Sequence, residues 1–111
     1  MKEKGRQGAP RDKYSPHHSL EGIQRLVKTA KWHPTTSALK NALEDFGLLE
    51  PGIENAILAM RGREFYKSMT SKSDYTIWQD VYLTRVSGLE AYVKLQIADG
   101  ACVVISFKRK S

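Results

Sequence analysis

The spacing of apolar residues changes once along this chain of 111 residues, at Gly62. Before Gly62, apolar side chains recur every three or four residues, which is the spacing of one helix face. After it they alternate with polar side chains, which is typical of strands with one buried face. Helices followed by strands predict an α+β domain, with N-terminal helices packed on one face of a twisted antiparallel sheet.

Three helices are predicted, and each has an end signal. Ser19 can cap the first helix, and Thr35 or Thr36 can cap the second. Gly47 suits the left-handed residue after the second helix, and Pro51 suits the first turn of the third. The predicted buried face of the second helix consists of Leu39, Ala42, Leu43 and Phe46.

The clearest strand pair lies between Glu90 and Lys108. A three-residue loop at 99–101 would form a uniformly apolar face by pairing Ile97 with Val103, Leu95 with Ile105, and Val93 with Phe107. The other face would then pair Tyr92 with Lys108 and Lys94 with Ser106. A two-residue turn at Asp99-Gly100 would split the apolar face, so the longer loop is predicted.

Two more segments are rich in strand formers. A strand is predicted from Trp78 to Arg85, where each face mixes polar with apolar side chains. A bulge near Gln79 or Asp80 would resolve that conflict. The segment 65–69 fits either a strand or a turn of helix.

The charge distribution divides the chain. Residues 1–18 hold five Lys/Arg against two Asp/Glu, with Gly and Pro among them, and are predicted to be a flexible basic N-terminal arm. Residues 19–111 form the predicted domain, and in 61–111 nine Lys/Arg face five Asp/Glu. A basic surface favours a polyanionic partner, either nucleic acid or an acidic protein.

Several classes of protein are not expected. No apolar run reaches about 18 residues and the N-terminus lacks a secretory apolar stretch, so no membrane association and a cytoplasmic location are expected. Cys102 is the only cysteine, which excludes an internal disulfide and a thiolate zinc cage. With no acid pair or metal-ligand motif, we expect no metal site and no cofactor.

Amine, phenol and amide groups are concentrated in the strand-rich half. They suit cleavage of a phosphodiester by a neighbouring 2′-hydroxyl, which needs a proton acceptor, a proton donor and positive charge around the phosphate. Lysines at 67, 94 and 108 would lower one another's pKa, and the same crowding would favour tyrosinate at Tyr92.

An ordered set of motifs resembles the MqsR (motility quorum-sensing regulator) toxin family. The matching runs are Phe65-Tyr66-Lys67-Ser68-Met69-Thr70, Ser73-Asp74, Thr76-Ile77-Trp78-Gln79-Asp80-Val81-Tyr82 and Ser106-Phe107-Lys108. The resemblance implies a RelE-like fold and metal-independent cleavage of mRNA at short GC-containing sites. It also implies neutralisation by a cognate MqsA-like antitoxin, through which alone DNA would be contacted.

The resemblance also implies a set of site residues. The family's catalytic positions fall on Lys67, Gln79, Tyr92 and Lys108. The RNA-binding positions are expected at Tyr66, Met69, Arg85 and Lys94, although Leu83-Thr84-Arg85 differs from the family's Arg-Pro-Arg pattern.

The resulting hypothesis is a sequence-selective endoribonuclease, the toxin of a toxin–antitoxin pair. Lys67 and Tyr92 would share the proton transfers, and which of them is acid and which is base stays open. Lys108 would stabilise the phosphorane and Gln79 would orient the phosphate or the 2′-hydroxyl. Two alternatives are a basic domain that binds RNA or ribosome without cutting it, and a regulatory partner of a DNA-binding antitoxin.

Overall fold

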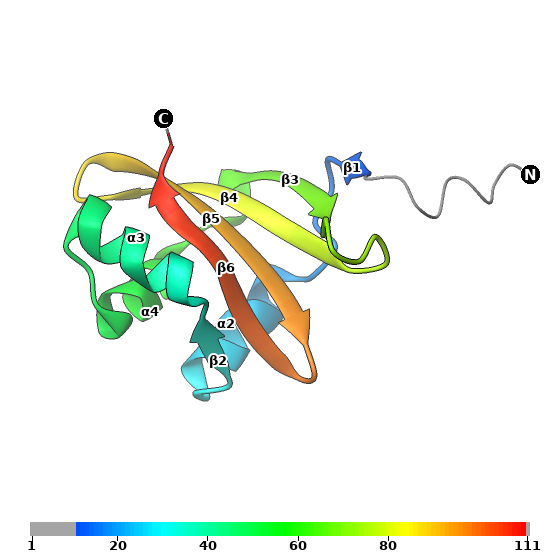
Figure 1. Ribbon diagram of the computed structural model, residues 1–111, viewed down its shortest axis with the longest axis horizontal. Helices are drawn as coiled ribbons and strands as arrows, with labels where there is room; N and C mark the ends of the chain where they lie inside the picture. The colour runs from blue at the N-terminus through cyan, green and yellow to red at the C-terminus, as the bar shows by residue number, and fades with distance from the viewer. Residues whose placement is uncertain (1–10, 111) are drawn as a thin grey trace, which may run out of the picture.

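The computed structural model describes residues 11–110 and confirms an α+β fold (Figure 1). Its helices are α2 (Leu20–Lys28), α3 (Thr36–Phe46) and α4 (Glu50–Ala59), followed by the 3₁₀ turn η1 (Gly62–Glu64). Its strands are β1 (Asp12–Lys13), β2 (Trp32–Pro34), β3 (Phe65–Thr70), β4 (Trp78–Val86), β5 (Leu89–Ala98) and β6 (Ala101–Arg109). The helix α4 therefore ends before Gly62, and 65–70 is a strand.

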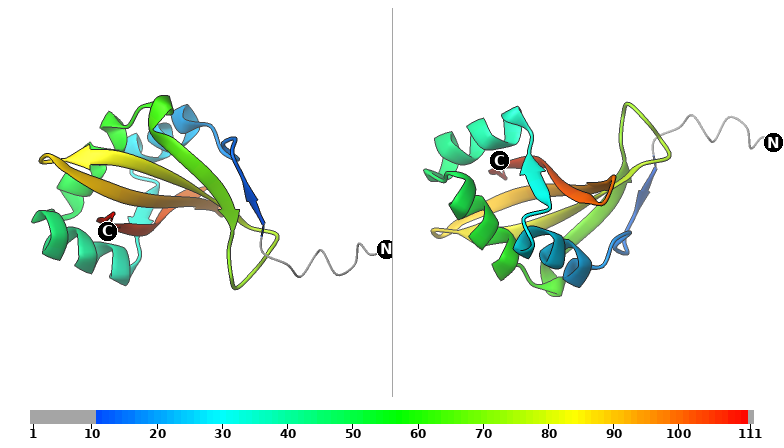
Figure 2. Two further views of the ribbon diagram at one scale, coloured as in Figure 1. Left: turned by 90° about the horizontal axis from the view of Figure 1, so that it is seen from above. Right: turned by 90° about the horizontal axis from the view of Figure 1, so that it is seen from below.

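The six strands form one sheet in the order β1-β3-β4-β5-β6-β2. Every neighbouring pair is antiparallel except β2 and β6, which are parallel. The helices lie together on one side of the twisted sheet (Figure 2). None of the helices over residues 11–110 has the length and apolar character that crossing a bilayer requires.

The helix ends confirm the predicted caps. The Ser19 hydroxyl accepts a hydrogen bond from the Gly22 N–H at 2.9 Å, and the Thr35 hydroxyl accepts one from the Ala38 N–H at 3.0 Å. Gly47 follows α3 with a φ of 70°, in the left-handed region that a residue with a Cβ rarely adopts.

The predicted buried face of α3 is partly wrong. Leu39 and Leu43 are 37% and 51% exposed, whereas Ala38 and Ala42 are fully buried. The helix packs against β6, and the small alanine side chains allow its backbone to approach that strand closely. With the alanine side of α3 facing β6, the two leucines are left exposed to solvent.

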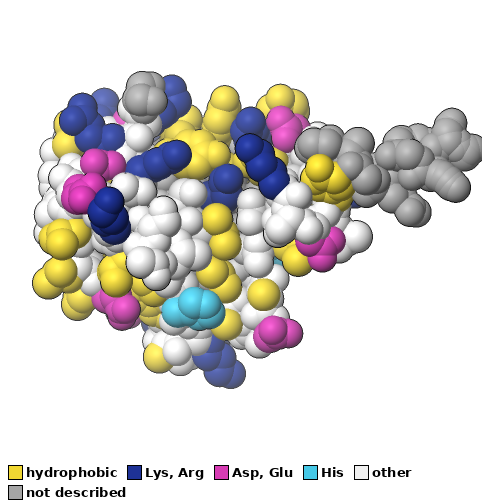
Figure 3. Space-filling view, in the orientation of Figure 1, with side chains coloured by type: hydrophobic (Ala, Val, Ile, Leu, Met, Phe, Trp, Pro, Cys, Tyr) yellow, Lys and Arg dark blue, Asp and Glu magenta, His cyan; other side chains and the backbone are white. Residues whose placement is uncertain are grey.

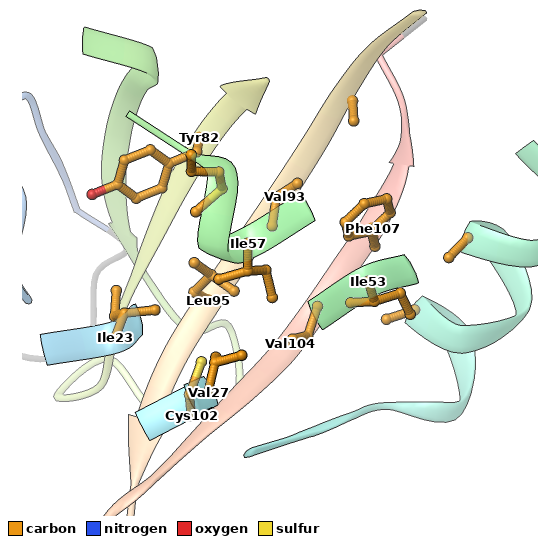
Figure 4. Packing of buried hydrophobic residues seen from close by; sticks show 14 of the residues in the cluster. Ile23, Val27, Ile53, Ile57, Tyr82, Val93, Leu95, Cys102, Val104 and Phe107 are labelled. Carbon is orange, nitrogen blue, oxygen red and sulfur yellow. The ribbon is translucent and has the colours of Figure 1, made fainter. Parts of the chain in front are cut away.

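The core lies between the helices and one face of the sheet (Figure 4). Its largest fully buried apolar members are Ile23, Val27, Ile53, Ile57, Tyr82, Val93, Leu95, Val104 and Phe107. Removing so many aliphatic and aromatic side chains from water supplies most of the stabilisation of a domain of this size.

The hairpin of β5 and β6 has the shorter turn, so the predicted three-residue loop is wrong. Asp99 and Gly100 have φ of 52° and 73°, the conformation of a tight two-residue turn, and Ala98 pairs with Ala101. Leu95 therefore pairs with Val104 rather than with Ile105.

A bulge shifts the pairing of β5 with β6 by one residue further along the hairpin. Lys94 pairs with Ser106, which leaves Ile105 as the extra residue of β6. From there the predicted pairs are confirmed: Val93 with Phe107, Tyr92 with Lys108. The inward side chains of β6 are consequently Cys102, Val104 and Phe107, not Val103, Ile105 and Phe107.

A second bulge lies in β3, between Phe65 and Lys67, and not near Gln79 or Asp80 as predicted. The mixed composition of β4 has a different explanation. This strand is central, and most of its side chains are buried on both faces. Its buried polar side chains at Gln79 and Asp80 form hydrogen bonds, so a change of face is unnecessary there.

The N-terminal segment differs from the predicted flexible arm wherever the structure describes it. Residues 1–10 lie outside the described part, but from residue 11 the chain is attached to the sheet. Strand β1 pairs with β3. The Thr70 N–H donates to the Arg11 carbonyl, and the Arg11 N–H donates to the Thr70 hydroxyl oxygen, each at 2.9 Å. The His17 ring stacks on Trp78 with centroids 5.5 Å apart. Backbone pairing and ring stacking hold a segment that has little apolar surface of its own.

The carboxylate of Asp80 anchors this segment from inside the protein. Asp80 is fully buried and accepts hydrogen bonds from the backbone N–H groups of His17 and His18 and from the Ser68 hydroxyl. The Ser68 hydroxyl lies 2.6 Å from the Asp80 Oδ1. A buried carboxylate requires such donors, because its desolvation is otherwise strongly unfavourable.

We expect Asp80→Ala to lower the free energy of unfolding by about 1–3 kcal/mol, because it leaves two backbone N–H groups without their acceptor. The measurement is urea denaturation, together with hydrogen exchange at the His17 and His18 amides, which should become faster. Glu90→Ala removes an exposed carboxylate and should change neither. Unchanged exchange at both histidines in the Asp80 variant would contradict the anchoring role.

Candidate active site

The face of the sheet opposite the helices, called the open face here, carries nearly all the predicted site residues. Register places Lys67, Val81, Lys94 and Ser106 side by side across four strands. The neighbouring row contains Leu83, Tyr92 and Lys108. Side chains alternate between the two faces along a strand, so residues paired across strands lie on the same face. Both rows lie on the open face.

The first hollow on this face has a volume of about 390 Å³. It is lined by Tyr66, Lys67, Tyr92, Lys108, Arg109 and Lys110. Three of the four predicted catalytic residues thus meet there, contributed by β3, β5 and β6. The Lys108 Nζ lies 5.4 Å from the centre of the Tyr92 ring. Cations and phenols around an open hollow suit an anionic ligand.

Both bulges help to build this hollow. In β3 the bulge lets the consecutive residues Tyr66 and Lys67 line the same hollow, which a regular strand would prevent. In β6 the bulge at Ile105 moves Lys108 to the side of Tyr92. Without it, Lys108 would share the face of Val104 and point toward the core.

A second hollow of about 330 Å³ adjoins the first. It is lined by Met69, Thr70, Ser71, Lys72, Ser73, Gln79 and Lys94. The Tyr92 hydroxyl lies 3.9 Å from the Met69 sulfur, and the Lys94 Nζ lies 5.9 Å from the Tyr92 ring centre. The side chains of Met69 and Lys94 therefore connect the two hollows.

Four predicted site residues lie outside the first hollow: Met69 and Lys94, described above, and Gln79 and Arg85. Gln79 is buried and lines the second, where its Nε2 donates a hydrogen bond to the Gln96 Oε1 at 2.8 Å. Arg85 lies near the far end of β4 and donates to the Gly88 carbonyl at 2.8 Å. Arg85 lines neither hollow.

Burial shifts the pKa values of two site residues. It raises the pKa of Tyr92, an effect that the Lys67 ammonium opposes and that Tyr66 and Asp12 strengthen. The expectation that crowded lysines favour tyrosinate at Tyr92 is therefore wrong, because desolvation outweighs the nearby ammonium. Burial lowers the pKa of Lys94, and Lys108, Lys72 and Lys67 lower it further.

Asp12 is a site residue that the sequence did not indicate. Its Oδ2 lies 3.5 Å from the Lys67 Nζ, in a partly exposed ion pair. Pairing of β1 with β3 brings this carboxylate to the first hollow. A two-residue strand has too few positions to show alternation, so the sequence carried no signal of it.

The open face is predominantly basic. Lys and Arg side chains gather along the upper part of the molecule, over the C-terminal end of β6 and over β3 and β4 (Figure 3). Within residues 11–110, no three His, Cys, Asp or Glu side chains lie close enough together to hold a metal ion. The chemistry available at the hollows is that of amine, phenol, amide and hydroxyl groups.

Comparison with known proteins shows the family of this chain. Residues 15–109 match the family described as motility quorum-sensing regulator, toxin of MqsA. The chain is also 39% identical to the mRNA interferase toxin MqsR of Escherichia coli (strain K12) over 99 residues, which cover 89% of this chain and 99% of that protein. The chain therefore belongs to the MqsR toxin family.

Proposed function

We propose that this protein is an mRNA interferase, an endoribonuclease that cleaves mRNA at short GC-containing sites. One observation carries the proposal: Lys67, Tyr92 and Lys108, from three strands, line one hollow on a basic sheet face. The name of the E. coli relative, mRNA interferase toxin, supports the same activity.

The helices on one face and the antiparallel strands β3 to β6 favour a RelE-like fold. In such an arrangement the free sheet face holds the RNA. Phosphates of the RNA backbone would contact the lysines of the open face, and Tyr66, 44% exposed, would stack on an unpaired base.

The reaction begins with attack of a 2′-hydroxyl on the adjacent phosphorus, and the 5′-oxygen of the next nucleotide leaves. Tyr92 protonates this leaving oxygen, because its raised pKa keeps the phenol protonated near neutral pH. Lys67, in its uncharged amine form, takes the proton of the attacking hydroxyl, so the two residues share the proton transfers. The fragments end in a 2′,3′-cyclic phosphate and a 5′-hydroxyl.

Two further residues assist without exchanging protons. The Lys108 ammonium, beside the Tyr92 ring, stabilises the negative charge that develops on the phosphorane. Gln79 lines the second hollow and orients the nucleoside that carries the attacking 2′-hydroxyl. Every step in this scheme uses side chains of the chain itself, without a metal or cofactor.

A nuclease with this activity requires an inhibitor in its own cell. We propose an MqsA-like antitoxin as the partner in a type II toxin–antitoxin pair. The family description, toxin of MqsA, supports an antitoxin partner. DNA would be contacted only through that antitoxin. An mRNA substrate also implies that the protein acts in the cytoplasm, where its release from the antitoxin arrests growth.

We expect Lys67→Met and Tyr92→Phe each to lower the single-turnover cleavage rate of a GC-containing RNA by about 10²- to 10⁴-fold, the usual contribution of one acid or base. Lys28→Met removes a charge on the helix side and should leave the rate unchanged. Chelators should have no effect, and the fragments should carry a cyclic phosphate.

Products with a 3′-hydroxyl would contradict the mechanism. RNA that is bound but left whole by the wild-type protein would favour the non-catalytic alternative. In cells, Lys67→Ala should abolish growth arrest while antitoxin binding is retained. Undiminished arrest by this variant would instead favour a regulatory role in the antitoxin complex.

The phenol of Tyr92 should titrate above about pH 10, the ordinary value for tyrosine. Since the unfolded chain releases this proton at lower pH than the folded one, Tyr92 ionisation should also reduce stability above about pH 10. The absorbance difference at about 295 nm between wild type and Tyr92→Phe isolates this residue. A transition below pH 10 would assign Tyr92 the role of base.

Asp12→Asn should increase affinity for RNA, because the Asp12 carboxylate competes with phosphate for the Lys67 ammonium. An exposed ion pair contributes at most about 1 kcal/mol, so the expected gain is about two- to fivefold and should shrink as salt rises. Fluorescence anisotropy with a 2′-deoxy-substituted, uncleavable RNA measures it, with Glu90→Gln as control. Weaker binding by Asp12→Asn would show that Asp12 assists the site.

A further inference from the structure

The second hollow has a different chemical character from the first. Around the first hollow lie lysines, an arginine and phenols, which suit a phosphate. Around the second lie a buried amide, a thioether, two lysines and the hydroxyl groups of Thr70, Ser71 and Ser73. Amides and hydroxyls combine donors with acceptors, as a nucleobase edge does.

We propose that the second hollow binds the nucleoside on the 5′ side of the cut, and that Gln96 determines how its base is recognised. This inference rests on the proposed ribonuclease function. It adds a base subsite and Gln96, which lies outside the four proposed catalytic residues.

The proposed reaction indicates which part of the RNA each hollow would hold. The attacking 2′-hydroxyl belongs to the nucleoside on the 5′ side of the scissile phosphate. With that phosphate in the first hollow, this nucleoside lies within one nucleotide of it. The second hollow is close enough, because Met69 lines it and also contacts the Tyr92 hydroxyl at 3.9 Å. It is assigned to the 5′ side because Gln79, which the proposed mechanism gives to the nucleoside with the attacking hydroxyl, lines it as well.

Gln96 holds the amide of Gln79 in one orientation. Its Oε1 accepts one of the two Gln79 Nε2–H groups at 2.8 Å, so the Gln79 Oε1 is directed to the opposite side. The remaining N–H and Oε1 of Gln79 present a donor beside an acceptor. A base edge that presents an acceptor to this N–H and a donor to this Oε1 can form both hydrogen bonds. A base edge with donor and acceptor exchanged leaves both Gln79 groups unpaired. Gln96 therefore acts as a positioning residue.

The rim of the second hollow is ordered before any ligand binds. In the loop from β3 to β4, Asp74 accepts hydrogen bonds from the backbone N–H and the hydroxyl of Thr76, at 3.0 and 2.6 Å. The Ser71 N–H donates to the Ile77 carbonyl across the loop at 2.8 Å. An ordered rim lowers the entropic cost of binding.

Two lysines at the second hollow supply positive charge that can bind the RNA phosphates. Lys72 is exposed on the rim, and Lys94 is half-buried beneath it. We assign Lys72 to the phosphate that precedes the bound nucleoside. A phosphate contact of this kind contributes to affinity for all sequences alike and carries no base preference.

The test uses four oligonucleotides that differ only in the base on the 5′ side of the cut. Gln96→Met keeps the side-chain length but removes the acceptor, so the ratio of kcat/KM between the best and worst base should fall by about tenfold. Preference on the 3′ side should not change. Gln96→Glu retains an acceptor for the Gln79 N–H and should restore the preference, at a higher KM.

Lys72→Met gives a second, independent readout. It should raise KM for all four oligonucleotides equally and reduce the dependence of log KM on log salt by about one unit. Lys28→Met, which removes the same charge on the helix side, should change neither quantity. An unchanged salt dependence for Lys72→Met would overturn the phosphate assignment.

NMR keeps the base subsite testable even if Gln96→Met folds poorly. A dinucleotide with 2′-deoxyribose at the attacking position should shift the side-chain amide signals of Gln79 and Gln96 in the wild-type protein. Unshifted amides, or a folded Gln96→Met enzyme with wild-type base preference, would overturn the inference. Failure of wild type to cut any of the four RNAs would instead refute the proposed function.

Discussion

The side chains of β6 change face at Ile105, and the arrangement of both faces of the sheet depends on that change. The turn at Asp99-Gly100 sets one register, which places Cys102 and Val104 in the core. One extra residue then shifts the strand, so that Phe107 enters the core and Lys108 lies beside Tyr92. A single bulge thus satisfies apolar burial and positions an ammonium on the open face, two requirements that a regular strand could not meet together.

Charge crowding on the open face is stable because most of the amines remain near water. Lys67 and Lys94 are the exceptions, since both are half-buried, and burial lowers the pKa of Lys94. Lys67 has a carboxylate partner in Asp12. The site thus combines hydrated lysines, which attract a polyanion through long-range electrostatics, with buried groups whose proton affinities differ from those in solution.

The segment before α2 lies partly ahead of the match to the family, which begins at residue 15. Backbone pairing to β3, the His17 stack on Trp78 and the donors to Asp80 together hold residues 11–18 against the sheet. Because Asp12 belongs to this segment, attachment of the N-terminus and the charge balance at Lys67 are coupled. A buried carboxylate on β4 thereby influences the neighbourhood of a proposed catalytic amine on β3.

Sequence alone determined the class of the fold, the helix caps at Ser19 and Thr35, and the left-handed Gly47, because these follow from local spacing and from residue chemistry. The predicted pairing of Tyr92 with Lys108 is also observed, but it depends on the bulge at Ile105 and not on the predicted loop. The family motifs predicted Lys67 and Gln79 as site residues, and the structure places Lys67 at the first hollow and Gln79 at the second. Tertiary structure alone decided the rest. The exposed leucines of α3 reflect how closely that helix approaches β6, and the strands β1 and β2 exist only because a neighbouring strand offers hydrogen bonds. The positions of the two bulges, the ion pair of Asp12 and the raised pKa of Tyr92 arise from contacts between segments far apart in the chain, whose energies no local pattern records.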